Sequence, residues 1–142
     1  MRNRKTQKAY NEKLKSIKDG ECEFCKMHSE SVNPMYMDCS RTDDSLVFEN
    51  EYPHQIIEQR YVKKSLVFIT KRHVSAFNDL TLYEEKDLID YIRYYENEGC
   101  NLILCNMGNG GNKSVAHFHI QIFKLGKKAN VLDQILYLLK LK

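Results

Sequence analysis

The chain has 142 residues, of which 42% are hydrophobic, so it is long enough for one compact core and too short for two ordinary domains. Its five cysteines, an odd number, argue against a disulfide framework, and the lack of a long apolar run argues against a secretory leader or a membrane span. The net charge is only +3, but seven lysines and arginines lie within the first 18 residues and five lysines lie after residue 123. We therefore expect a soluble, intracellular protein with basic ends and no membrane partner.

The first 20 residues are predicted to form a basic helical extension. Tyr10, Leu14 and Ile17 recur at spacings of four and three, which indicates a helix over residues 4–18 with a thin apolar stripe, ended by Gly20. Basic segments of this kind favour an anionic partner such as a phosphorylated ligand or a nucleic acid, although most are simply solvated. Because no nucleic-acid-binding motif accompanies the basic ends, nucleic acid is the less favoured partner.

Residues 21–142 are predicted to form a single domain in which strands outnumber helices. Thr81 and Glu84 form a capping box at the start of a helix that Gly99 ends, and residues 131–141 are predicted to form a last helix. The short strand-like runs are 35–39, 45–50, 64–70, 100–105 and 116–125. The pattern predicts an α+β domain with a mainly antiparallel sheet of about five strands packed by helices.

The last strand-like run carries polar side chains at alternate positions. His117, His119 and Gln121 share one face of the predicted strand, while the apolar residues between them face the core. A neutral imidazole is a good nucleophile near neutral pH, and the phosphoramidate that it forms is labile enough to be displaced in a second step. The glycine-rich loop at 106–112 and the Ser114 hydroxyl are suited to contact phosphate oxygens. The less favoured alternative is that the histidines lie on an exposed strand face and have no functional role.

A second candidate site is the pair Cys22 and Cys25, whose two-residue spacing suits both thiolates to one tetrahedral zinc ion. Histidines would complete the ligand set, and spacing alone does not choose among His28, His73 and His117. A redox pair or two plain core cysteines are the alternatives, but the sequence context expected for a redox fold is absent. We therefore favour a structural zinc ion.

From Cys22 to Phe123 the chain resembles the histidine triad superfamily of nucleotide hydrolases and transferases. The pattern of that superfamily is three histidines that alternate with apolar residues. Here Gln121 takes the third place, as in the branch that includes galactose-1-phosphate uridylyltransferase. Four other segments resemble the same branch in the same order: Cys22-x-x-Cys25, residues 46–53, His73 after the buried strand, and Ser114 three residues before His117.

The resemblance implies a nucleotidyl transferase or hydrolase that acts at a nucleotide α-phosphate. His119 would be the nucleophile and would carry a covalent nucleotidyl intermediate. Gln121 would hold the phosphoryl group without titrating, which favours transfer over hydrolysis. The implied ligands of a structural zinc are Cys22, Cys25, His73 and His117, the implied phosphate contacts are Ser114 and Asn106, and Asn50 and Glu51 would lie near the nucleoside.

The uridylyltransferase has two such repeats in one chain, whereas this chain has room for one. The resemblance therefore implies a symmetric homodimer, which is usual in the shorter members of the superfamily. It also makes a dinucleotide or a nucleotide-capped end a better candidate substrate than a hexose phosphate. Because kinship of fold does not settle activity, a nucleotide-binding or nucleic-acid-binding module with little or no turnover is the alternative.

Overall fold

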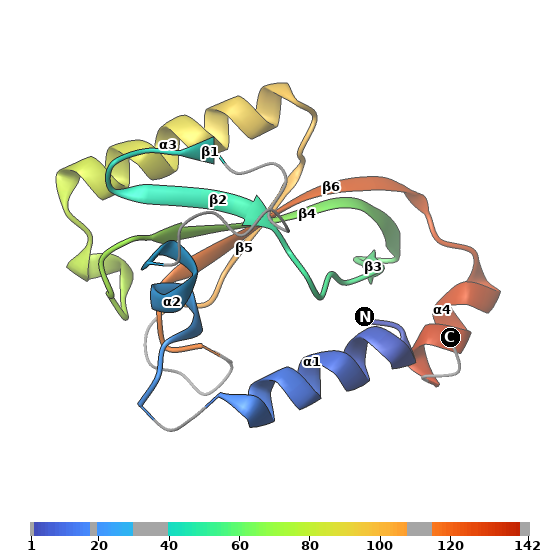
Figure 1. Cartoon of the computed structure of the whole chain (residues 1–142). Helices are drawn as coiled ribbons and strands as arrows, with labels where there is room; N and C mark the ends of the chain where they lie inside the picture. Colours follow the sequence, from blue (N-terminus) through green and yellow to red (C-terminus); the bar gives the residue numbers. More distant parts are fainter. Residues whose placement is uncertain (1, 18–19, 30–39, 108–114, 140–142) are drawn as a thin grey trace.

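A computed structural model describes residues 2–17, 20–29, 40–107 and 115–139 of the chain (Figure 1). Within these residues the helices are α1 (Arg4–Ser16), α2 (Glu23–Ser29), α3 (Leu82–Asn97) and α4 (Val131–Leu138), with a 3-10 turn η1 at Phe77–Asp79. The strands are β1 (Ser40–Arg41), β2 (Ser45–Glu49), β3 (Ile56–Ile57), β4 (Arg60–Thr70), β5 (Leu102–Cys105) and β6 (His119–Lys128). The predicted run at 35–39 lies outside the described residues.

The described strands form one antiparallel sheet in the order β1-β2-β4-β6-β5, with β3 paired to β4. The two longest strands, β4 and β6, lie side by side, in a register that pairs Phe68 with Ile120 and Ile69 with His119. Strand β5 forms an edge of the sheet. The predicted α+β class with a mainly antiparallel sheet is confirmed.

The two faces of the sheet pack against different helices, because side chains alternate along each strand. Phe68 of β4 points to the α3 face and contacts Tyr91, with 5.9 Å between the ring centroids. Ile69, the next residue, points to the opposite face and belongs to the apolar cluster that packs against Phe24 of α2. Helix α1 also lies on the α2 side of the sheet (Figure 1). His119 pairs with Ile69, so the start of β6 lies beside this second cluster.

The sequence-based elements differ from those of the structure at several points. Residues 23–29 form helix α2, which the sequence did not predict. Strand β6 begins at His119 rather than at residue 116, because the Phe118 N–H donates to the Val74 carbonyl at 2.6 Å instead of to a neighbouring strand. It then runs on to Lys128. The predicted helices over 4–18, 81–99 and 131–141 correspond to α1, α3 and α4.

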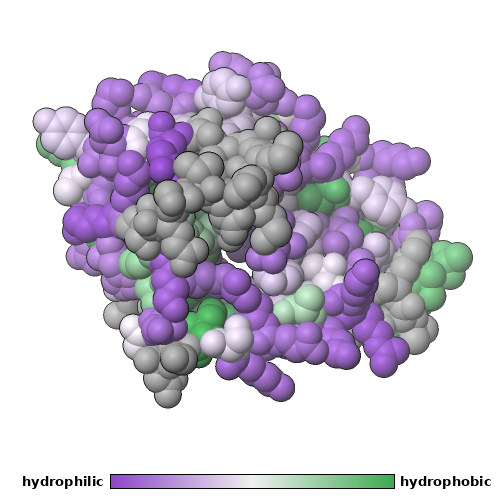
Figure 2. All heavy atoms as spheres, in the orientation of Figure 1, coloured by the Kyte–Doolittle hydropathy of each residue, from purple (hydrophilic) through white to green (hydrophobic). Residues whose placement is uncertain are grey.

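Helix α4 is the last described element, and much of its apolar surface is uncovered. Val131, Leu132 and Leu138 are exposed, and Figure 2 shows hydrophobic surface at the edge of the molecule where α4 lies. None of the helices in the described part of the chain is long and apolar enough to cross a membrane.

Helix α3 begins with the predicted capping box, which also holds a buried carboxylate. The Thr81 hydroxyl accepts from the Glu84 N–H, and the Glu84 carboxylate accepts from the Thr81 N–H and from the Arg72 guanidinium, each at 2.8 Å. Burial alone would raise the pKa of Glu84, but the hydrogen bonds from Arg72 and Thr81 outweigh it and hold that pKa below its ordinary value. Gly99 follows the helix with a positive φ of 86°, as a residue that ends a helix often does.

We predict that Glu84→Gln lowers the free energy of unfolding by about 1–3 kcal/mol at pH 7, because it removes a charge-assisted hydrogen bond. The pKa of Glu84 is lower in the folded chain than in the unfolded chain, so its charge stabilises the fold above the ordinary value of 4.5. This contribution is lost as the pH falls through the folded-state pKa. Urea unfolding of both proteins should therefore show a gap in stability that narrows between pH 7 and pH 3, and a constant gap would contradict the prediction.

Candidate functional site

Four potential metal ligands from three parts of the chain meet on the α2 face of the sheet. The ligand atoms of Cys22, Cys25, His73 and His117 all lie within 4.8 Å of one another. His117 Nδ1 is 3.4 Å from Cys22 Sγ and 3.5 Å from Cys25 Sγ, and His73 Nδ1 is 3.3 Å from Cys25 Sγ. Tetrahedral bonds of about 2.3 Å to sulfur and about 2.0 Å to nitrogen place such atoms about 3.5 Å apart. The four side chains are thus spaced to hold a metal ion.

The ligands are delivered by α2 and by the ends of the two central strands. Cys22 precedes α2 and Cys25 lies in its first turn. His73 follows β4 and His117 precedes β6, and the residues after the two histidines share a backbone hydrogen bond of 2.6 Å. Among the histidines that spacing left open, His73 and His117 meet the thiols. The side chain of His28 lies outside the described residues.

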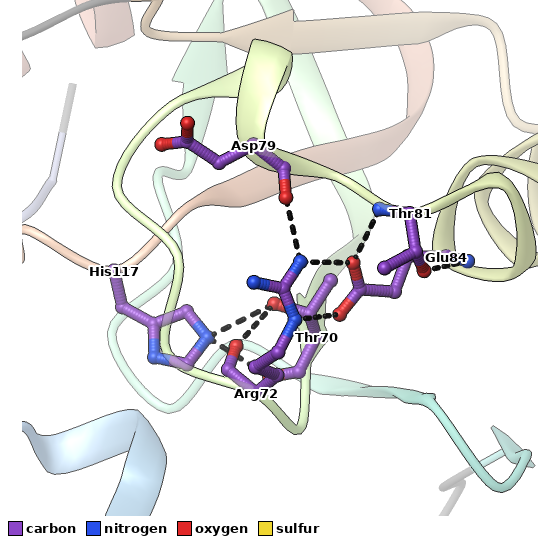
Figure 3. Close-up of polar contacts among 6 residues, drawn as sticks. All are labelled: Thr70, Arg72, Asp79, Thr81, Glu84 and His117. Carbon is purple, nitrogen blue, oxygen red and sulfur yellow. Dashed lines mark hydrogen bonds and ion pairs between the residues drawn. The ribbon is translucent and has the colours of Figure 1, made fainter.

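His117 is fully buried, and its ring is hydrogen-bonded to Thr70 at the end of β4 (Figure 3). Its Nε2 donates to the Thr70 carbonyl at 2.8 Å, which leaves Nδ1 as the nitrogen that faces the thiols. The Thr70 hydroxyl donates to the Arg72 carbonyl, and the Arg72 guanidinium pairs with Glu84 and donates to the Asp79 carbonyl. Hydrogen bonds thus connect the start of α3 to the four-ligand cluster.

The surroundings of the two cysteines suit metal ligands. Burial, followed by the neighbouring Cys22 thiol, raises the pKa of Cys25 to about 11. Its Sγ atom lies 3.3 Å from His73 Nδ1 and 3.5 Å from His117 Nδ1, so two imidazoles converge on this thiol. Both cysteines are also only half-buried, which argues against a plain core role.

His119 lies at the start of β6 and lines a cavity that adjoins the four-ligand cluster. The residue is only 8% exposed, and its Nδ1 donates to the His117 carbonyl at 2.9 Å. This hydrogen bond selects the tautomer whose Nε2 keeps its lone pair, the form that a nucleophile needs. Gln121 lines the same cavity, two residues further along the same face. The Phe24 ring contacts both imidazoles, with centroids 5.8 Å from His117 and 5.3 Å from His119.

The cavity has a volume of about 80 Å³ and a largely apolar lining with a few polar groups. Asn50 and Glu51 contribute polar groups from the turn after β2. The apolar lining from α2, the sheet and the segment before β6 consists of Phe24, Met27, Phe48, Val67 and Val115. The N-terminal segment adds Arg2, Tyr10, Lys13 and Leu14. An apolar hollow with a few placed polar groups is typical of a small-molecule site.

The remaining predicted contact residues differ in where they lie relative to the cavity, which Asn50 and Glu51 line. The turn that carries Asn50 and Glu51 is fixed by hydrogen bonds, because Asn50 Oδ1 accepts from the Tyr52 N–H at 2.9 Å and the Glu51 carboxylate accepts from the Tyr52 hydroxyl at 3.1 Å. Asn106 follows β5, is exposed, and is not among the described residues that line the cavity. Ser114 and most of the glycine-rich loop lie outside the described residues.

Sequence reasoning missed the aromatic part of the cavity. The sequence signal for Phe24 was its position between the two paired cysteines, and that for Phe48 was its place in the motif after residue 45. It also missed the contribution of α1 to the cavity wall. The apolar stripe with Tyr10 and Leu14 had indicated only that one face of this helix packs against other residues.

No protein-family model and no curated protein matches the sequence. Solved structures do match the fold. A Hit-like protein matches with a TM-score of 0.58 and 20% sequence identity, over 75% of this chain and 100% of that one. A histidine triad protein from Clostridium difficile matches with a TM-score of 0.53 and 21% sequence identity, over 80% of this chain and 97% of that one. A HIT family hydrolase from Legionella pneumophila Philadelphia 1 matches with a TM-score of 0.53 and 20% sequence identity, over 76% of this chain and 94% of that one. The chain therefore has the histidine triad fold, and the likeness predicted from its motifs is confirmed at that level.

Proposed function

We propose that this protein is a nucleotidyl transferase or hydrolase that acts at the α-phosphate of a nucleotide through a covalent intermediate on His119. The observation that carries the proposal is the hydrogen bond from His119 Nδ1 to the His117 carbonyl. It keeps the lone pair on Nε2 of an imidazole that lines an apolar cavity. The names of structural neighbours, which include HIT family hydrolases, support an enzyme of this general kind.

The proposed reaction consists of two displacements at phosphorus. First, the His119 Nε2 lone pair forms a P–N bond, while the P–O bond to the leaving group breaks and the leaving group departs with its electron pair and takes up a proton. Second, an acceptor hydroxyl or water forms a new P–O bond and loses its proton, and the P–N electrons return to Nε2. The Gln121 amide donates to a phosphoryl oxygen but never titrates, so proton transfer falls to the substrates, which favours transfer over hydrolysis.

Four further residues are proposed to contact the substrate. Asn50 and Glu51 would bind the nucleoside, and their place in the cavity lining supports this role. Asn106 and the Ser114 hydroxyl would contact the phosphate. For Asn106 the support is the register that pairs Cys105 with Ile120, which leads the chain after β5 toward the start of β6.

We also propose that the four-ligand cluster holds a structural zinc ion. The bound ion would supply fixed geometry rather than direct chemistry on the substrate. Its influence would pass through His117, whose ring is a ligand and whose carbonyl accepts the hydrogen bond from His119. One residue thus links the metal cluster to the catalytic imidazole.

A panel of dinucleoside polyphosphates, sugar nucleotides and nucleotide-capped oligonucleotides tests this function. We expect the zinc-loaded protein to release or transfer a nucleotidyl group from at least one of them, with or without an added acceptor. Tight nucleotide binding without turnover of any substrate would favour a binding module instead. Binding of nucleic acid that weakens steeply with salt and does not respond to His119→Ala would indicate a nucleic-acid-binding role.

We further propose that two copies of the chain pair along β5. This strand is a sheet edge, and its Ile103 and Leu104 are 41% and 43% exposed. We predict that Ile103→Lys converts the dimer to monomers in analytical ultracentrifugation, because the new charge would have to be desolvated where the apolar faces of the two copies meet beside the paired edge strands. The matched control Val131→Lys, at an exposed position of α4, should remain dimeric. A wild-type protein that sediments as a monomer at micromolar concentration would contradict the proposal.

A further inference from the structure

Helix α1 and the residues just before it form one wall of the cavity that contains His119. Their contribution consists of Arg2, Tyr10, Lys13 and Leu14. In Figure 1 the helix lies on the same side of the sheet as α2, opposite to α3. The basic extension, which the sequence placed outside the domain, therefore takes part in the surface of the candidate site.

Polar and aromatic contacts fix the start of this wall to the turn after β2. The Arg2 guanidinium lies over the Tyr10 ring, 4.1 Å from its centroid, and Arg2 Nε donates to the Tyr52 carbonyl at 2.7 Å. The Tyr10 and Tyr52 rings are 5.7 Å apart. The Asn3 N–H donates to Gln55 Oε1 at 2.7 Å. Tyr10 is thus held between a guanidinium and a second ring at the nucleoside end of the proposed site, beside the turn that carries Asn50.

The far end of the wall is joined to α2 through charge. Lys13 Nζ lies 3.0 Å from the Glu23 carboxylate, at the first residue of α2. That hydrogen bond, opposed by partial burial, raises the pKa of Lys13, so the pair stays charged at neutral pH. Because α2 also carries Phe24 and Cys25, the ion pair places α1 directly over the aromatic lining.

Helix α1 does not contribute to the hydrophobic core. None of its residues is buried, and its outer surface is mainly hydrophilic (Figure 2). The cavity that it borders measures about 80 Å³ and is partly open to solvent, whereas sites that enclose a drug-sized ligand measure about 300–1,000 Å³. Outward movement of this wall would make room for a whole nucleoside. Contacts made by exposed and half-buried groups allow such a movement at little cost.

We propose that α1 is a movable wall of the substrate site, and that Tyr10 and Leu14 contact the base of the bound nucleotide. The inference rests on the proposed function, because it takes the ligand to be a nucleotide. The cavity brings the Tyr10 ring together with the rings of Phe24 and Phe48, and a flat base gains affinity from each aromatic face that covers it. The N-terminal helix thus helps to set the affinity and the base preference of the site.

Substitutions on the two sides of α1 separate substrate binding from a purely structural role. Tyr10→Ala should weaken the binding of AMP, CMP, GMP or UMP by about 5-fold to 100-fold in calorimetric titrations, the range for loss of an aromatic contact to a base. Lys15→Ala, at an exposed position of the same helix, should bind them as the wild type does. Both variants should keep the wild-type melting temperature and metal content, because α1 contributes no buried residue.

A fluorescence reporter gives a second readout that stability does not affect. The chain contains no tryptophan, so the variant Tyr10→Trp has a single indole in the wall. Its emission should change when a nucleoside monophosphate is added and should not respond to inorganic phosphate, which has no base. The control Tyr83→Trp, at a position that is 73% exposed on α3, should respond to neither.

Two outcomes would overturn the inference, and they are distinguishable. Wild-type nucleotide affinity in Tyr10→Ala, together with a silent Tyr10→Trp reporter, would exclude α1 from the binding site and leave the proposed function intact. Failure of the wild type to bind any of the four nucleoside monophosphates or any substrate of the panel would exclude the proposed function, and the role of α1 with it.

Discussion

His119→Ala should lower kcat by at least about 1,000-fold on any substrate that the wild type turns over, because it removes the atom that forms the covalent bond. The affinity for the substrate should change far less, since the apolar cavity lining and Gln121 remain. Steady-state and single-turnover kinetics of the two proteins measure both quantities. Loss of affinity with an unchanged kcat would assign His119 to binding rather than to the chemistry.

Two further variants sharpen this test. His119→Gly should regain part of its turnover when free imidazole is added, because a small nucleophile can occupy the space of the missing ring. Tyr83→Ala, a change at an exposed position of α3, should keep the wild-type kcat. If His119→Ala itself retained wild-type turnover, covalent catalysis by this residue would be excluded.

Cys25→Ser should abolish near-stoichiometric zinc binding and lower the melting temperature by about 10 °C or more. The ligand atoms of the cluster are donated by α2 and its preceding residue and by the segments that adjoin β4 and β6, so the ion would tie the short helix α2 to the ends of the two central strands. Free zinc at 1,000 times its Kd stabilises a fold by about 4 kcal/mol, which corresponds to about 10–15 °C for a domain of this size. Elemental analysis and circular dichroism measure the two effects.

The chain supplies matched controls for the zinc prediction. Cys105→Ser changes a half-buried cysteine outside the cluster and should keep the metal. His28→Ala should keep it as well, because the cluster is complete with His73 and His117. A purified wild-type protein without zinc, or a Cys25→Ser variant that still binds one ion per chain, would refute the four-ligand proposal.

The parts of the fold that sequence predicted best are those set by local interactions. The capping box of Thr81 and Glu84 joins residues three positions apart, and Gly99 adopts a positive φ that few other residues tolerate. The apolar run at 64–70 likewise predicted a strand, and in β4 its side chains face two different apolar clusters. Such signals are contained in short windows of sequence, so no tertiary contact is needed to find them.

The features that sequence missed depend on contacts between distant residues. Helix α2 has only seven residues and is too short to form from propensity alone, so it depends on packing such as that of Phe24 against Phe48, whose ring centroids are 6.0 Å apart. The wall formed by α1 depends on contacts such as that between Arg2 and Tyr52, 50 positions apart. Spacing likewise could not choose the zinc ligands, because His73 and His117 reach Cys25 only through the antiparallel pairing of β4 with β6.

The stereochemical course at phosphorus tests the central claim most directly. A substrate whose α-phosphorus is made chiral by a sulfur and a labelled oxygen would be turned over by the wild type, and the configuration of the product determined. Two successive in-line displacements, the first by His119, predict net retention of configuration. Net inversion would show a single direct displacement and would contradict a nucleotidyl intermediate on His119.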